Sequence, residues 1–119
     1  MTVQECYNKM HGNYSEVLER LGMDRIIEKF LLKFPQDESM NQLRSAIQEG
    51  DIEGSFKAAH TLKGVAANLA FTELQKATDV LTEQLRPKNE PADPTLVAAV
   101  EKAYNDTITA IEEFQQVNA

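Results

Sequence analysis

Features that are scarce or missing narrow the classes to which this chain of 119 residues can belong. Cys6 is its single cysteine, so no disulfide can form within the chain. No apolar run approaches the roughly 20 residues of a membrane-spanning helix, and the N-terminus lacks the basic and then apolar segments of a secretory signal. These absences predict a soluble protein of the reducing cytoplasm, without a membrane partner.

Positively charged residues are also few. The 12 Lys and Arg residues against 19 Asp and Glu residues give a net charge of −7, which argues against nucleic-acid binding by phosphate neutralisation. Residues 54–72 are the exception, because they contain Lys57 and Lys63 but no acidic side chain. Such a local positive field favours a phosphate group or an anionic partner at this place, although two solvated lysines on a helix face give the same pattern.

Strand patterns are missing as well, since no segment alternates polar and apolar residues with a period of two. Helical spacing of apolar residues predicts helices over residues 2–10, 13–22, 24–49, 52–69, 72–86 and 94–117. Pro35 predicts either a kinked helix over 24–49 or a break near 34–38. We therefore expect one all-α domain over 1–119. The expected architecture is an antiparallel up-down-up-down four-helix bundle with a short additional N-terminal helical segment across one end.

One histidine stands out in the fourth of these helices. His60 falls about 130° from the centre of the apolar stripe of its helix, on an exposed shoulder. A histidine side chain is largely neutral near pH 7, so its ring nitrogen is a competent nucleophile. Lys63 lies one turn away and Gly64 has no side chain to block an approaching protein. A glycine inside a helix costs about 1 kcal/mol relative to alanine, so its presence beside the histidine calls for a reason such as this.

The surrounding residues resemble the signature of histidine-containing phosphotransfer (HPt) domains, the four-helix phosphocarriers of two-component phosphorelays. The signature residues are Ala59-His60, Leu62-Lys63-Gly64, Asn68-Leu69 and Leu74, with any residue allowed at position 61. The resemblance covers essentially the whole chain, including Arg20-Leu21-Gly22 and Glu49-Gly50-Asp51. It implies that His60 accepts the phosphoryl group, that Lys63 neighbours the phosphate and that Gly64 gives steric clearance.

Two positions depart from the family pattern. The family commonly has glycine where this chain has Ala70, so the helix must end in another way. Family members often place Gln or Glu in the following helix to hydrogen-bond the far nitrogen of the histidine ring. By count this position is Thr82, which is short, and Glu83 is a possible substitute. Lys57 and the small Ala67 complete the set of possible supporting residues around the histidine.

The resemblance also implies the partners. The phosphoryl group would be exchanged with an aspartate of a response-regulator receiver domain and would originate from a sensor or hybrid histidine kinase. A docking surface is expected at Ile26, Ile27 and Phe30, next to the histidine helix. On this interpretation the protein is a monomeric phosphohistidine carrier, with no cofactor, no metal and no enzymatic machinery of its own.

The alternative to a phosphocarrier is a non-catalytic adaptor, a helical bundle that binds a signalling partner without chemistry. A di-iron bundle site would need Glu three residues before a histidine on two inward faces, but Lys57 and Asn8 occupy those positions. Hydrolase and phosphate-loop motifs are absent from the sequence. His11, beside Gly12, lacks such neighbours and is interpreted as a surface residue.

Overall fold

The chain folds into helices alone over the residues that the structure, a computed structural model, describes, which are 1–118. These are α1 (Val3–Lys9), α2 (Tyr14–Leu21), α3 (Asp24–Lys33), the 3₁₀ turn η1 (Phe34–Gln36), α4 (Ser39–Gln48), α5 (Ile52–Asn68), α6 (Thr72–Leu85) and α7 (Pro94–Asn118). Within 1–118 there is no strand, which confirms the prediction of an all-α fold. Over the same residues, no helix has the length and apolarity needed to span a membrane.

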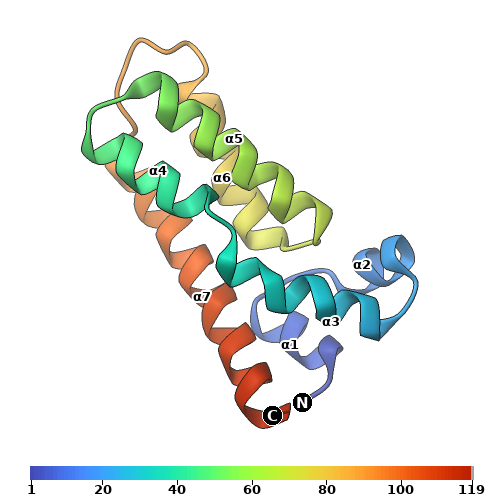
Figure 1. The fold of residues 1–119 in the computed structure, drawn as a ribbon. Helices are drawn as coiled ribbons and strands as arrows, with labels where there is room; N and C mark the ends of the chain where they lie inside the picture. Colours follow the sequence, from blue (N-terminus) through green and yellow to red (C-terminus); the bar gives the residue numbers. More distant parts are fainter. Residues whose placement is uncertain (119) are drawn as a thin grey trace.

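Helices α4 to α7 lie side by side and form the larger part of the molecule (Figure 1). α5 packs against α4 and α6, and α6 packs in turn against α7. Arg44 of α4 closes the arrangement by donating two hydrogen bonds, of 2.7 and 3.0 Å, to the carboxylate of Glu101 on α7. Apolar side chains from all four helices are buried between them, among them Leu43, Leu62, Leu81, Val100 and Ile111.

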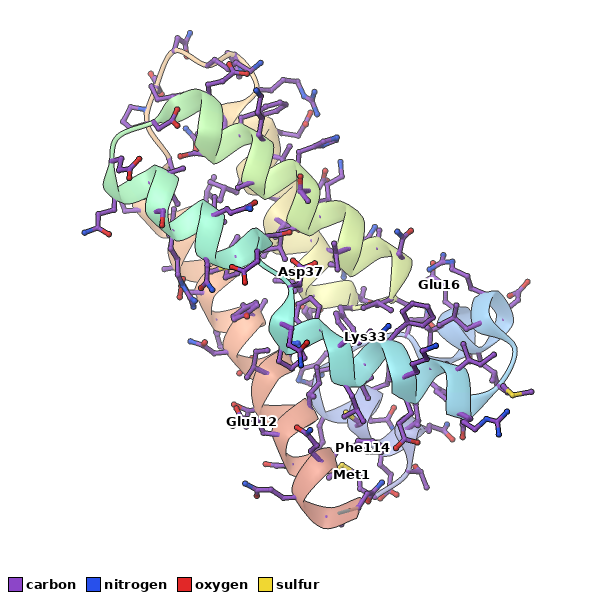
Figure 2. All side chains as sticks on the ribbon, in the orientation of Figure 1. Met1, Glu16, Lys33, Asp37, Glu112 and Phe114 are labelled. Carbon is purple, nitrogen blue, oxygen red and sulfur yellow. The ribbon has the colours of Figure 1, made fainter. Side chains whose placement is uncertain are left out.

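The helix expected over 24–49 is interrupted, as the second of the two alternatives for Pro35 required. Pro35 lies in η1, between α3 and α4. The turn places the Phe34 ring in the core, 5.0 Å from the centroid of Phe71 in an edge-on arrangement. Asp37 lies at the break (Figure 2), where its carboxylate accepts the first backbone N–H of α4 at 2.9 Å. Proline and a local cap therefore divide one apolar pattern into two helices.

The N-terminal elements close one end of the molecule. α1 packs against α7, and α2 against α3. The Cys6 thiol is fully buried and donates to the carbonyl of Ala110 on α7 at 3.5 Å. Met1 and Phe114 lie at this same end (Figure 2), and the N-terminal amino group donates to the side chain of Asn118 at 3.1 Å. The two ends of the described chain are thus held together.

The C-terminal end of α5 shows how this helix ends with Ala70 in place of the usual glycine. Ala70 itself adopts the left-handed backbone conformation, with φ 57°, that glycine usually supplies at a helix end. The backbone N–H of Phe71 then donates to the carbonyl of Ala66 at 2.9 Å and completes the turn into α6. Alanine pays roughly 1–2 kcal/mol of strain in this conformation, which the packing of a fully buried residue has to offset.

Side chains from α1 and α2 hold this end of α5 in place. The Tyr7 hydroxyl donates to the carbonyl of Leu69 at 2.8 Å. The Arg20 guanidinium donates to the carbonyls of Ala67 and Asn68 at 2.9 and 2.7 Å. The last carbonyls of a helix have no partner within it and carry partial negative charge, so a cation here is favourable. The N-terminal segment thereby fixes the helix that carries the candidate site.

Candidate functional site

The direction in which His60 points follows from how α5 is anchored. The helix starts where the Asp51 carboxylate accepts the N–H of Gly54 at 2.9 Å. Ala59 and Leu62, on either side of the histidine in sequence, are fully buried against the neighbouring helices. Their burial sets the rotation of α5 about its axis, and His60 is consequently exposed to solvent.

The imidazole of His60 rests against one aromatic ring. Phe56, one turn earlier on α5, stacks on it with ring centroids 6.0 Å apart and an angle of 7° between the ring planes. No group within residues 1–118 forms a hydrogen bond with the ring nitrogens of His60. The histidine therefore offers an exposed nucleophilic nitrogen that no protein donor or acceptor occupies.

Lys63 has an acidic partner on the adjacent helix. Its ammonium Nζ lies 3.1 Å from Oδ1 of Asp79 on α6, and its side chain is 29% exposed against 52% for that of Asp79. Lys63 is thus held at the surface between α5 and α6, three residues after the histidine. An ammonium on a flexible stem can exchange one anionic partner for another, which makes this group available to a phosphate.

Gly64 leaves free space beside the histidine. A Cβ atom placed on it would have no neighbouring heavy atom within 4 Å, so packing within the chain does not require a glycine here. Ala67 follows one turn later with a small and partly exposed side chain. No large side chain therefore projects from the surface on this side of His60, and another molecule can approach it closely.

Neither residue expected to orient the histidine ring does so. Thr82 is fully buried, and its hydroxyl donates to the carbonyl of Thr78 on its own helix at 2.6 Å. Glu83 is paired with Arg86, with Oε2 2.7 Å from the guanidinium NH2. The hydrogen bond from Arg86 lowers the pKa of the Glu83 carboxyl. In this structure Thr82 is bonded within its own helix and Glu83 to Arg86, and neither forms a hydrogen bond with the ring of His60.

Comparison with known proteins decides the family. The sequence model of the family described as Hpt domain matches residues 25–114. The chain belongs to the Hpt domain family. Comparison with curated proteins and with solved structures found no match. The matched part of this Hpt domain runs from α3 to α7 and includes all of α5, whereas α1 and α2 lie before it. Hpt domains are histidine phosphotransfer carriers of phosphorelays.

The expected docking residues of the Hpt domain divide between its surface and its core. Ile26 and Phe30 are 38% and 42% exposed. Ile27 is fully buried and packs into the core, so its place in a docking surface is corrected. Met23, at the start of α3, is 49% exposed and extends the exposed stripe one turn further. The positions 23, 26 and 30 follow helical spacing, and so form one face of α3.

Further side chains near His60 were not anticipated from the sequence. Arg86 and Lys88 place their charges 5.3 and 4.7 Å from the centroid of the Phe56 ring. By helical spacing alone, Phe56 belongs to the apolar stripe of its helix, which gives it no role at the histidine. Arg86 was predictable from the sequence. In an antiparallel hairpin, residues at equal distances from the turn lie opposite each other, and Phe56 and Arg86 are equally far from Phe71. Lys88 gave no such signal, because it lies beyond α6 in a left-handed conformation with φ 58°.

The remaining candidates contribute less to the site. Lys57 is highly exposed and lies 3.9 Å from the carboxylate of Glu53, a long ion pair of small energetic value. His11 is exposed, with a left-handed backbone of φ 58°, which agrees with its interpretation as a surface residue. Within residues 1–118, no three His, Cys, Asp or Glu side chains are grouped so that they could bind a metal ion.

Proposed function

We propose that this Hpt domain accepts a phosphoryl group on His60 from the aspartyl phosphate of a receiver domain and passes it on to a receiver aspartate. The observation that carries the proposal is the exposed imidazole, whose ring nitrogens have no hydrogen-bond partner within residues 1–118. Such a nitrogen can attack phosphorus directly.

The reaction that we propose breaks one bond and forms another. A ring nitrogen of neutral His60, which we assign as Nε2, attacks phosphorus in line with the bond to the receiver's aspartate. The N–P bond forms as the P–O bond breaks, and the aspartate leaves as a carboxylate. Transfer to a second receiver runs the same steps in reverse. The receiver supplies the magnesium ion and most of the charge stabilisation, so this chain acts as a carrier and not as an enzyme.

Lys63 and Gly64 have distinct roles in this proposal. The carried phosphoryl group adds a charge of roughly −1.5 to −2, which the Lys63 ammonium would partly offset. Its pair with Asp79 holds that ammonium on the same surface, at 3.1 Å from the carboxylate. The open space at Gly64 lets the receiver bring its aspartate up to the imidazole.

We also propose how the partners are bound. The exposed face of α3 formed by Met23, Ile26 and Phe30 would receive an apolar patch of the receiver, since large exposed apolar side chains gathered on one face indicate a binding surface. The same face would serve a sensor or hybrid kinase. The carrier in this proposal is one domain, 1–119, acting as a cytoplasmic monomer, and its four-helix up-down-up-down unit is α4 to α7.

The test is phosphate transfer from a receiver domain that carries a radioactive aspartyl phosphate. We expect label on the wild-type protein in an acid-labile, base-stable linkage. His60→Gln removes the nucleophile and is expected to abolish labelling with little change in stability, because the side chain is exposed. His11→Gln is the matched control, because it replaces the other exposed histidine and should leave labelling unchanged.

Two results would contradict the proposal. Persistent labelling of His60→Gln would show that another residue is the acceptor. Binding of the receiver without any transfer to the wild-type protein would favour the non-catalytic adaptor. For the docking face, Phe30→Ser should raise the receiver concentration that gives half-maximal transfer while leaving the rate at saturation unchanged. An unchanged concentration would remove Phe30 from the docking surface.

A further inference from the structure

Within residues 1–118 the His60 ring has an aromatic contact and no hydrogen bond. The residues that could reach it from α6 are bonded elsewhere, Thr82 to its own helix and Glu83 to Arg86. Phe56 is the ring in contact with it, at 6.0 Å between centroids and with the planes 7° from parallel. Residues one turn apart on a helix lie on the same face, so this contact is built into α5.

Phe56 is itself held by residues at the C-terminal end of α6. It is partly buried against the core. The cations of Arg86 and Lys88 lie 5.3 and 4.7 Å from its ring centroid, within the range of cation–π contacts. Each cation is held in turn by a carboxylate. Nζ of Lys88 is 3.4 Å from Glu53, and the guanidinium of Arg86 is 2.7 Å from Glu83. The aromatic ring against which His60 rests is therefore restrained by two further residues.

We propose that Phe56 is a positioning residue for phosphotransfer, which orients the imidazole of His60 by stacking on it from the preceding turn of α5. This inference rests on the proposed function. An exposed histidine side chain would otherwise rotate among its staggered conformers, and only some of these direct Nε2 toward a docked receiver. A parallel ring restricts that rotation without using either nitrogen, so the nucleophile stays free while its direction is set.

A positioning role for Phe56 predicts different effects on two kinds of phosphoryl donor. Orientation matters when a docked receiver fixes the line of attack, because phosphorus can then be approached from one direction only. It matters little for a small phosphoryl donor such as phosphoramidate, which can approach an exposed imidazole from many directions. Loss of the Phe56 ring should therefore affect transfer from a receiver and spare phosphorylation by phosphoramidate.

The stack itself is tested by proton NMR, independently of any phosphate transfer. In the wild-type protein we expect the carbon-bound ring protons of His60 to be shifted upfield by the Phe56 ring current. Phe56→Leu should remove that shift, and Phe56→Tyr, which keeps an aromatic ring, should retain it. The ring protons of His11 are the internal control and should not move. Identical His60 signals in wild type and Phe56→Leu would show that the stack does not form.

Kinetics then test the role in positioning. Phe56→Leu is expected to slow saturated transfer from a phosphorylated receiver by roughly three- to tenfold, with the half-saturating receiver concentration unchanged. Its labelling by phosphoramidate should match wild type, and Phe56→Tyr should restore the rate with the receiver. Lys88→Gln removes one cation but keeps the Phe56 ring, which Arg86 and the core still hold, so it should transfer at close to the wild-type rate.

The outcomes separate this inference from the proposed function. If Phe56→Leu and wild type transfer equally from the receiver, or if both donors are slowed alike in a folded Phe56→Leu, Phe56 does not position the ring. If Lys88→Gln keeps the upfield shift of the His60 ring protons and is still slowed as much as Phe56→Leu, the positive charge acts and the ring does not. If the wild-type protein takes no phosphoryl group on His60 from either donor, the proposed function fails, while the NMR comparison still reports on the stack.

Discussion

At the scale of single residues, Lys63 is already ion-paired before any phosphoryl group arrives. Its Nζ lies 3.1 Å from Asp79, and both side chains are partly exposed, at 29% and 52%. A pair exposed to this degree is worth only about 0–1 kcal/mol after solvent screening, so a dianionic group nearby can compete for the ammonium. The same pair keeps a negative charge near the place where the phosphoryl group would arrive.

The two members of this pair should affect transfer in opposite directions. Lys63→Ala is expected to slow transfer from a receiver without unfolding the protein, and Asp79→Asn, which removes a negative charge near the phosphoryl group, is expected to raise the rate. The loss in Lys63→Ala should shrink as salt is added, because the Debye length is roughly 8 Å at physiological ionic strength. Transfer rates measured against salt concentration for the three proteins check this. Equal rates for wild type and Lys63→Ala at low salt would leave Lys63 without a role.

Two substitutions at Gly64 separate its effect on helix stability from its effect on the access of a receiver to His60. Nothing within the chain contacts a Cβ added here, so Gly64→Ala should stabilise the protein by about 0.5–1 kcal/mol through helix propensity. Gly64→Gln should be stabilised nearly as much but should slow transfer, because its side chain fills space one turn from His60. Urea unfolding and transfer rates measure the two effects. A Gln variant that transfers as fast as the Ala variant would remove the steric explanation.

At the scale of elements, the site is built on a hairpin whose register the sequence partly reveals. α5 and α6 are joined at Ala70 and Phe71, so residues equally distant from Phe71 face each other. Counting outward places Lys63 opposite Asp79 and His60 opposite Thr82. The ion pair between Lys63 and Asp79 agrees with this register. Whether a side chain then reaches across depends on its length and on competing partners, and Thr82 donates to its own helix.

The apolar pattern of α3 shows a second limit of sequence reasoning. Two stripes with helical spacing run along this helix, one through Met23, Ile26 and Phe30 and the other through Ile27 and Leu31. Only the second is buried. Both stripes have the composition of a core face, and which of them is covered depends on how α1 and α7 pack against α3. The local spacing of apolar residues does not reveal this long-range packing. For that reason Ile27 was expected at the surface.

The end of α5 depends on an element far away in the sequence, and this can be measured. Arg20 of α2 donates to the carbonyls of Ala67 and Asn68. Arg20→Ala is expected to destabilise the fold by about 1 kcal/mol, a value reduced because the side chain is 41% exposed. Arg25→Ala, at an exposed position on α3, should stay within about 0.5 kcal/mol of wild type.

Urea unfolding gives both free energies, and amide hydrogen exchange locates the effect. Faster exchange should appear in Arg20→Ala at residues 67–71 and should be absent in Arg25→Ala. If the two variants are equally stable and exchange alike, the hydrogen bonds from Arg20 do not fix the end of α5.

At the scale of the whole molecule, the buried thiol of Cys6 links stability to pH. Burial raises the pKa of this thiol from an ordinary 9.0 to about 11. Below about pH 9 the folded and unfolded chains both keep the proton, and the thiol has its full stabilising effect. Above pH 9 the unfolded chain loses the proton first, so the free energy of unfolding falls until about pH 11, by about 2–3 kcal/mol in total.

Comparison with Cys6→Ala isolates this contribution. The variant should be less stable at neutral pH, because a buried side chain and its contact with Ala110 are lost. Its stability should nevertheless fall less steeply than that of wild type between pH 9 and pH 11. Urea unfolding at several pH values gives the slope of the free energy of unfolding against pH for each protein. The effects of lysine and tyrosine titration are common to both proteins and cancel in the difference between the two slopes. Parallel slopes would mean that the thiol ionises as easily in the folded chain as in the unfolded one.

The neighbouring chain ends carry a consequence for topology. Met1 and Asn118 exchange two hydrogen bonds, of 3.1 and 2.8 Å, and the ends lie side by side in Figure 1. A short peptide could therefore join them without moving a helix. New ends could open between Asn89 and Glu90, both exposed in the connection from α6 to α7. Such a circular permutant would make α7 precede α1 in sequence and would leave the α5–α6 hairpin, with the site it carries, unbroken.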